Sequence, residues 1–372
     1  MKTVWFLKQL YDIIFSKFVG YLVGDVMVLK KIVRKTLEVL YSPLNKQAYI
    51  HMIDYSNERP LDINIETTTI CPMSCKFCCN RIYNRKKEVM SVQTFNSIIS
   101  EYVETMGGGT VGIGSMQSDF LSDPLILERM EIISKNKKSL YVHSTTPLIS
   151  AARFSDSELL SIIENMDFLD VSVEGYDTDS YEMMCGVNGF NVLIAQLKRI
   201  HRLIDENSLP LHVSLEFRTF DKQKLYQSKS YKELTSMFNE GNTLDTFFSW
   251  FGSIKETDLP LGAKLLISYN DNKNVDCVVP YATLAIQTNG NVVGCGCIDW
   301  LEANVIGNIN DNSLLDIWKS DKAVSFRTAF SKRDGDLPQI CKECGLYTPI
   351  TCFSRKELKK YKSMDGLYYN IR

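Results

Sequence analysis

The stretch from Glu66 to Asn80, ETTTICPMSCKFCCN, places four cysteines within nine positions. Cys71, Cys75 and Cys78 follow the spacing C-x3-C-x2-C, and Cys79 stands outside this spacing. Three thiolates on one short loop can hold three irons of a cubane cluster and leave the fourth iron free for another ligand. A zinc site is the alternative, although it needs a fourth ligand and usually uses C-x2-C pairs.

An α/β pattern surrounds this stretch. Strands are predicted at 61–66, 110–114, 140–144, 168–173, 211–217 and 245–251, and helices at 91–106, 124–136, 156–165, 189–206 and 229–239. Six strand-helix repeats predict a partial (β/α)6 TIM-like barrel over residues 56–265. The carboxyl ends of the strands carry the chemistry in such barrels, and the cysteines directly follow the first strand.

A second cysteine group lies nearer the C-terminus. Cys277 and Cys295 flank two apolar runs joined by an Asn-Gly pair, which predicts a β-hairpin. Cys341 and Cys344 follow as a C-x2-C pair, after a helix predicted at 313–329 with Ser313 as its cap. Four thiolates from these two segments suit either a fully ligated cubane or a structural zinc site, and the spacing leaves both open.

The first group, following a strand that ends in Glu66, resembles the radical S-adenosylmethionine (radical SAM) enzymes over residues 61 to about 265. The resemblance implies that Cys71, Cys75 and Cys78 bind a [4Fe-4S] cluster whose open iron chelates S-adenosyl-L-methionine (AdoMet). Reductive cleavage of AdoMet in this family gives a 5'-deoxyadenosyl radical that abstracts hydrogen from substrate. An electron donor such as flavodoxin or ferredoxin is therefore expected as a partner.

The same resemblance implies a set of cofactor contacts. Phe77 matches the aromatic residue near the adenine. The stretch GIGSMQSDFLSDP stands where the family has a Gly-Gly-Glu-Pro-like sequence, but its glutamate and proline are absent. The residues expected at AdoMet are Phe77, Gly112, Gly114, Ser115, Met116, Gln117, Ser144, Thr145, Ser172, Glu174 and Arg218. Arg218 is equally well interpreted as a solvated charge at a strand end.

The second group resembles the SPASM or shortened "twitch" extension of radical SAM enzymes. Cys277, Gly290 and Cys295 form C-x12-G-x4-C, followed by IGNINDNSLLDIWKS and the C-x2-C pair. The resemblance implies that residues 266–372 form an auxiliary-cluster domain, a β-hairpin plus a helix, with Cys277, Cys295, Cys341 and Cys344 as [4Fe-4S] ligands. Only one cysteine, Cys352, follows Cys344 in the chain. The resemblance therefore implies one auxiliary cluster.

These features predict an anaerobic enzyme that oxidises or epimerises a small polar metabolite, such as a sugar or an aminocyclitol. A peptide-modifying enzyme, forming thioethers or epimerising residues, is the alternative, and a non-catalytic scaffold stabilised by metal is a further one. Cys297 and Cys185 are candidate hydrogen donors for epimerisation, although either also suits a buried packing role. His143 could act as a base, but a structural role is expected for all four histidines.

Composition narrows the class of protein. The chain has 372 residues, of which 45% are hydrophobic, so it can bury a large core. Its 42 basic and 44 acidic residues leave a net charge of -2, which gives no general attraction to nucleic acid. Its 11 cysteines are not spread like a disulfide framework and no signal peptide is evident, so a cytoplasmic location is expected.

A helical N-terminal segment is predicted over residues 1–55. Its first 50 residues carry eight lysines or arginines against three acidic residues. This excess of positive charge suits an amphipathic helix that contacts an anionic membrane surface or an acidic partner. Helices that pack on the main domain, with their lysines in solvent, are at least as good an interpretation. No apolar run reaches the roughly 18 residues needed to span a bilayer.

Overall fold

The computed structural model describes residues 57–83, 85–114, 118–238, 241–250, 252–260, 262–266, 277–295, 299–329, 337–342 and 344. The predicted N-terminal helices lie outside the described residues, as do Ser115, Met116, Gln117, Cys297 and Cys352.

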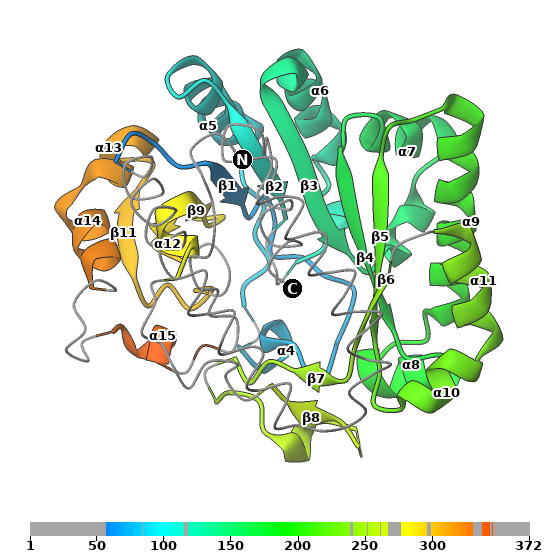
Figure 1. Cartoon of the computed structure of the whole chain (residues 1–372). Coiled ribbons are helices and arrows are strands. Elements are labelled where there is room, and N and C mark those ends of the chain that lie inside the picture. Colours follow the sequence, from blue (N-terminus) through cyan, green and yellow to red (C-terminus); the bar gives the residue numbers. More distant parts are fainter. Residues whose placement is uncertain are drawn as a thin grey trace, which may run out of the picture.

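A nine-stranded sheet forms the centre of the described structure, in the order β11-β10-β9-β1-β2-β3-β4-β5-β6 (Figure 1). The strands of the predicted barrel are β1 (Asp62–Ile65), β2 (Gly109–Ile113), β3 (Leu140–Thr146), β4 (Phe168–Glu174), β5 (His212–Arg218) and β6 (Gly241–Leu244). All six run parallel. Within the described part the sheet ends at β6 and β11, so it is an open, partial barrel, which confirms the predicted α/β class.

Helices cover the outer face of this sheet (Figure 1). Five lie within a few residues of their predicted positions: α5 (Val92–Glu104), α6 (Ile126–Asn136), α7 (Asp156–Ile163), α9 (Phe190–Asn207) and α11 (Lys229–Met237). Three further helices were not predicted: α4 (Cys79–Tyr83), α8 (Thr178–Cys185) and α10 (Lys222–Gln227). Short 3-10 turns occupy Phe120–Ser122, Lys137–Ser139, Ile149–Arg153 and Glu256–Asp258.

The two faces of the sheet differ in chemistry because successive side chains of a strand point to opposite faces. On β1, Ile63 and Ile65 are fully buried in the hydrophobic core, whereas Asp62 and Asn64 alternate with them. A Cβ atom at Gly112 of β2 would meet both Asn64 and His143 of β3, so these residues share one face. We call this polar face, opposite the helices, the lumen face.

The predicted strand at 245–251 is wrong in position. β6 is formed by the preceding residues 241–244, which pair with β5 from Leu215↔Gly241 onward. The absence of a side chain at Gly241 allows this approach, since an added Cβ would lie 3.1 Å from the Phe217 ring. The aromatic run after β6 forms only the two-residue β7 (Thr246–Phe247), paired with β8 (Lys264–Leu265), and packs elsewhere.

The C-terminal extension continues the same sheet. It comprises α12 (Val279–Ala282), β9 (Thr283–Ile286), β10 (Asn291–Val293), β11 (Val305–Asn308), α13 (Leu314–Lys319), α14 (Asp321–Thr328) and α15 (Gln339–Lys342). β9 and β10 form the predicted antiparallel hairpin, and β9 also pairs in parallel with β1. The helix predicted at 313–329 is two helices, because the extended Ser320 ends α13 and caps α14 through Ala323 N.

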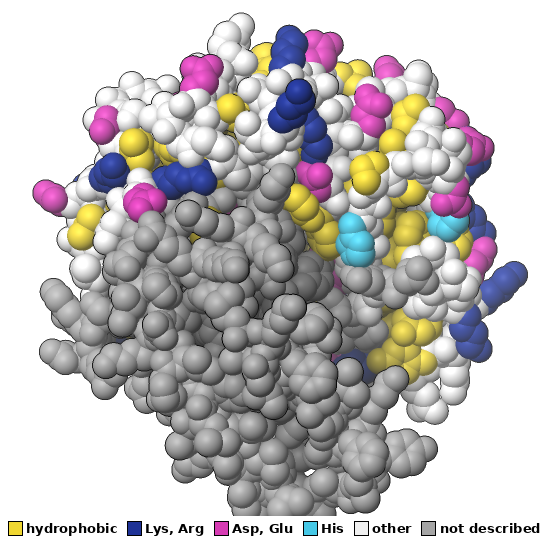
Figure 2. Space-filling view, turned by 45° about the horizontal axis from the view of Figure 1, so that its top comes forward, with side chains coloured by type: hydrophobic (Ala, Val, Ile, Leu, Met, Phe, Trp, Pro, Cys, Tyr) yellow, Lys and Arg dark blue, Asp and Glu magenta, His cyan; other side chains and the backbone are white. Residues whose placement is uncertain are grey.

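The described part of the face drawn in Figure 2 shows no single dominant charge. Figure 2 shows acidic and basic side chains interspersed across the part of this face that the structure describes. Among the described residues, no helix combines the length and the apolar character needed to cross a bilayer. The domain boundaries at residues 55 and 265 remain predictions.

Candidate active site at the carboxyl ends of the strands

The cysteine loop, residues 71–79, follows β1 and is fixed to the end of α8. Ser74 N donates to Cys185 O and Lys76 N donates to Met184 O, both at 2.9 Å. The next residue, Gly186, ends α8 in the left-handed region at φ +68°, and a Cβ there would lie 2.9 Å from Ser74 O. Glycine therefore allows the loop and the helix end to approach closely.

Aromatic residues support the loop from the other side. The Trp250 indole N–H donates to Phe77 O at 2.8 Å, and the rings of Phe77 and Phe247 lie 5.0 Å apart. These contacts explain why the run containing Phe247 and Trp250 leaves the sheet. This support of the cysteine loop was not predicted from the sequence. The only signal for it was that apolar and polar residues do not alternate regularly in the aromatic run at 245–251.

A partly buried arginine lies between two carboxylates near Phe77. The Arg218 guanidinium donates to Glu174 Oε1 at 2.9 Å and to Glu216 Oε1, and its Cζ lies 5.8 Å from the Phe77 ring. Burial alone would lower the pKa of Arg218, but the carboxylates of Glu216 and Glu174 outweigh it and raise the pKa. Burial raises the pKa of Glu174 to about 7, against the opposing effect of Arg218. Arg218 is thus an ion-paired residue and not a solvated charge.

The three predicted ligand thiols lie near one another. Burial raises the pKa of Cys71, and the Asp119 carboxylate and the charges of Cys75 and Cys78 raise it further. The pKa of Cys75 is also raised, first by a hydrogen bond with the Cys185 thiol and then by burial. Thiolates that are partly buried and repel one another need a cationic partner, and an iron-sulfur cluster supplies one. The donor set therefore fits the predicted cluster.

Cys79 differs from its neighbours. Its side chain is fully buried in the hydrophobic core, which agrees with a packing role. Its thiol also donates toward Cys78, and this hydrogen bond is the largest cause that lowers the pKa of Cys78. Cys79 is therefore adjacent to a predicted ligand in space as well as in sequence.

Cys185, a candidate hydrogen donor, is fully buried at the end of α8. Its thiol contacts Cys75, and Tyr181 one helical turn earlier donates to it. The position is beside the cysteine loop, and a role in hydrogen transfer remains a prediction. Cys297, the other candidate, lies outside the described residues.

The predicted AdoMet contacts divide between the faces of the sheet. Thr145 is exposed on β3, whereas the Ser144 hydroxyl points the opposite way and donates to Ile113 O at 2.5 Å. Ser172 and Glu174 lie in the register that pairs with Glu216 and Arg218 on β5, so they belong to the lumen face. The cofactor contacts of all of these residues remain predictions.

The two predicted glycines of the AdoMet site lie at the end of β2 and just after it. Gly112 lies on the lumen face, where an added Cβ would clash with Asn64 Oδ1. Gly114 turns the chain after β2 at φ +76°, and its N–H donates to Ile65 O at 2.9 Å. The turn leads to Asp119, a buried carboxylate that accepts hydrogen bonds from the hydroxyls of Thr146 and Ser122.

Glu66 joins the first cysteine group to the extension. Its buried carboxylate accepts two hydrogen bonds from the Arg85 guanidinium, at 2.5 Å and 3.0 Å. It also accepts hydrogen bonds from the Thr288 N–H at 3.1 Å and from the Thr288 hydroxyl at 2.9 Å. Arg85 follows the cysteine loop, and Thr288 lies in the turn between β9 and β10. One carboxylate therefore fixes both segments.

The four predicted auxiliary ligands surround the hairpin and α15. Cys277, Cys341 and Cys344 are buried and Cys295 is partly buried. Cys277 precedes α12, Cys295 follows β10, and Cys344 N donates to Cys341 O at 3.4 Å. Among the described residues, no three His, Cys, Asp or Glu side chains converge at the spacing of a single metal ion.

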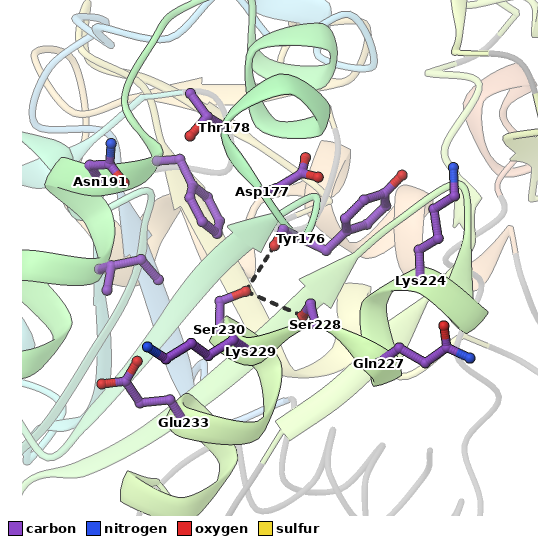
Figure 3. Close-up of a pocket in the computed structure, with 12 residues that line it drawn as sticks. Tyr176, Asp177, Thr178, Asn191, Lys224, Gln227, Ser228, Lys229, Ser230 and Glu233 are labelled. Atoms are coloured by element: carbon purple, nitrogen blue, oxygen red, sulfur yellow. Dashed lines mark hydrogen bonds between the residues drawn. The ribbon is translucent and has the colours of Figure 1, made fainter.

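A pocket of about 590 Å³ lies outside the barrel, among α8, α9, α10 and α11 (Figure 3). Ser230 donates to Tyr176 O at 2.8 Å and lies 3.2 Å from the Ser228 hydroxyl at its base. None of its described lining residues belongs to the cysteine loop or to the lumen face. The pocket is thus separate from the candidate active site.

Comparison with known proteins agrees with this geometry. The sequence model of the Radical SAM superfamily matches residues 65–217, and that of the SPASM iron-sulfur cluster-binding domain matches residues 277–345. The chain belongs to the radical SAM superfamily. The two matched segments together cover more than half of it and contain every predicted cluster cysteine. The superfamily and domain imply a [4Fe-4S] cluster, auxiliary iron-sulfur binding and AdoMet as cofactor.

A curated relative aligns over a short segment. The S-adenosyl-L-methionine-dependent 2-deoxy-scyllo-inosamine dehydrogenase of Niallia circulans is 34% identical over 71 residues. This alignment covers 19% of the present chain and only 28% of that protein's own length. It therefore does not by itself establish a shared substrate.

Two solved structures share the fold over most of their length. BtrN in complex with AdoMet and 2-DOIA is 16% identical, with a TM-score of 0.52, covering 79% of this chain and 96% of that one. The protein anSMEcpe with bound AdoMet and Kp18Cys peptide is 13% identical, with a TM-score of 0.51, covering 84% and 98%. At these identities the likeness shows the fold.

Proposed function

We propose that this radical SAM enzyme removes a hydrogen atom from a small polar metabolite, such as a sugar or an aminocyclitol, and oxidises or epimerises it. The observation that carries the proposal is the polar lumen face, which leads from the floor of the open barrel to the cysteine loop. The short alignment with an inosamine dehydrogenase supports the same substrate class.

The two cysteine groups have separate proposed roles. Cys71, Cys75 and Cys78 would hold the radical SAM cluster, and Cys277, Cys295, Cys341 and Cys344 one auxiliary cluster. When bound, the first cluster and AdoMet supply a hydrogen-atom abstractor, and the auxiliary cluster supplies an electron acceptor.

The chain's own residues position the reactants. Trp250 and Phe247 hold Phe77, and α8 holds the loop from the opposite side. Arg218, fixed by Glu174 and Glu216, presents a cation at the carboxyl ends of β4 and β5, where the carboxylate of AdoMet is proposed to bind.

The proposal is tested by anaerobic reconstitution followed by iron and sulfide analysis. Two cubanes predict about eight irons per chain and dithionite-dependent release of 5'-deoxyadenosine. Cys71→Ala should abolish this release, Cys344→Ala should retain some release but stop product formation, and Cys79→Ala, the matched control, should retain the radical SAM cluster. Equal release by wild type and Cys71→Ala would refute the assignment, and zinc in both sites would favour the metal-stabilised scaffold.

Oxidation and epimerisation are separated by turnover in heavy water. An epimerase that quenches the substrate radical with a cysteine hydrogen should place one solvent deuterium in the product, and Cys185→Ala or Cys297→Ala should block it. Product without solvent deuterium would indicate oxidation.

Peptide modification is the second candidate. It is supported by the fold shared with anSMEcpe, whose structure contains a bound peptide. A short cysteine-rich or leader-bearing reading frame beside the gene would favour this candidate. Binding of that peptide to the reconstituted enzyme, with no binding of small polyols, would replace the metabolite proposal.

A further inference from the structure

The last turn of α8 lies against the cysteine loop. Two backbone hydrogen bonds join them, one from Ser74 N to Cys185 O and one from Lys76 N to Met184 O, and each is 2.9 Å long. These bonds bracket Cys75, because their donors are the residues on either side of it. The backbone of this predicted iron ligand is therefore fixed next to the end of the helix.

Two buried side chains of α8 face the loop from this position. Tyr181 and Cys185 are four residues apart in the helix, so they lie on the same side of it, one turn apart. Both side chains are fully buried. The Tyr181 hydroxyl lies 3.9 Å from Sδ of Met73, the residue midway between Cys71 and Cys75 in the sequence. The helix thus directs a hydroxyl and a thiol toward the proposed cluster.

The two side chains form a series of hydrogen bonds that ends at Cys75. The thiols of Cys185 and Cys75 are hydrogen-bonded to each other, and the Tyr181 hydroxyl donates to Cys185. A cysteine that binds iron does so as a thiolate, and a thiolate can only accept a hydrogen bond. When Cys75 binds iron, the Cys185 thiol must therefore be the donor of this pair.

A donor at a ligand sulfur changes the free energy of electron uptake by the cluster. Reduction makes a cluster and its ligands more negative, so a hydrogen bond to a ligand thiolate is stronger in the reduced state. Such a bond therefore stabilises the reduced state and raises the reduction potential. The hydrogen bond is also stronger away from water, and the fully buried Cys185 is shielded from water.

We propose that Tyr181 and Cys185 raise the reduction potential of the radical SAM cluster by donating hydrogen bonds, in series, to the Cys75 thiolate. They act through Cys75 and are positioning residues. In the step that they affect, one electron passes from an external reductant to the cluster, and Cys185 keeps its proton. This role differs from hydrogen transfer to substrate, in which the Cys185 thiol would lose its hydrogen atom. The inference rests on the proposed function, because it assumes the cluster at Cys75.

The test is an anaerobic potentiometric titration of the reconstituted enzyme with dithionite, followed by electron paramagnetic resonance. AdoMet, added at the end, identifies the signal of the cluster with the open iron. Cys185→Ala removes the donor and should shift the equilibrium about tenfold toward the oxidised cluster, a fall of roughly 59 mV for a one-electron couple. Cys185→Ser keeps a hydroxyl donor and should restore most of the wild-type potential. Tyr181→Phe keeps the ring and should give a smaller fall.

Met183→Ala is the matched control and should keep the wild-type potential, because Met183 lies on the same helix but is 44% exposed. Wild-type potentials in both Cys185→Ala and Tyr181→Phe would overturn the assignment. If Cys185→Ala loses its iron or fails to fold, Tyr181→Phe decides alone: a fall supports the assignment and an unchanged potential overturns it. Absence of iron from the wild type would contradict the proposed function itself, so the two proposals can fail separately.

Discussion

At the scale of single residues, buried charges are satisfied by partners distant in sequence. Arg129 on α6 and Asp123 are both fully buried and joined at 2.8 Å. The same guanidinium also donates to Met90 O and, at 3.4 Å, to Thr67 O. Arg129 thus ties α6 to the segments on both sides of the cysteine loop.

Arg129→Met should strongly destabilise the protein, because it leaves the Asp123 carboxylate buried without its cation. The expected loss is about 3–5 kcal/mol of unfolding free energy, measured by chemical denaturation of the holoenzyme under anaerobic conditions. Arg202→Met, which removes a half-exposed arginine of α9, is the control and should change stability little. Addition of Asp123→Leu should restore part of the loss; no restoration would contradict the ion-pair explanation.

At the scale of elements, the end of α8 determines where the cysteine loop lies. Two backbone hydrogen bonds join them, and Gly186 faces Ser74 at the contact. Asp177 caps the start of α8 by accepting from Ser180 N, so the helix is defined at both ends.

Gly186→Ala should affect both stability and cluster content. A left-handed alanine costs about 1 kcal/mol, and its Cβ would also push against Ser74 O. Gly107→Ala is the matched control, because Gly107 has φ +78° and an added Cβ there would have no atom within 4 Å. Both variants should melt earlier than wild type, but only Gly186→Ala should lose iron from the radical SAM site. Equal iron in the two variants would show that this contact does not position the loop.

At the scale of the whole molecule, the barrel and the extension share one sheet. β9 lies beside β1, and α13 contacts α5 through Leu315 N donating to Glu101 Oε1 at 3.2 Å. Glu66 completes the connection through Thr288 in the hairpin turn. The two cysteine groups are therefore held by adjacent strands of one sheet.

Thr288→Val should weaken this connection. It removes the hydroxyl that donates to Glu66 and should cost about 1–3 kcal/mol, since a buried carboxylate loses a donor. Hydrogen exchange should accelerate both in the hairpin and in the segment after β1. Thr235→Val, which removes a hydroxyl bonded only within α11, is the control. Faster exchange confined to the hairpin would argue against coupling through Glu66.

The sequence alone determined the local features: cysteine spacing, the strand-helix alternation and the Asn-Gly hairpin. These depend on residues within one loop or one element, where periodicity and turn chemistry act directly. The same local patterns misplaced the sixth strand. Its position depends on the close approach of Gly241 to β5 and on the hydrogen bond from Trp250 to Phe77 O, which draws the aromatic run away from the sheet. It also could not show that Ser144 points away from the lumen.

Only the tertiary structure decided which distant residues meet. The sheet order places β9 beside β1, Glu66 beside Thr288, and the cysteine loop above Arg218. It also places Asp62 and His143 together on a buried polar face, although 81 positions separate them in the sequence. Such pairings arise because parallel strands align their ends and alternate their side chains, and no local pattern encodes which strand lies next to which.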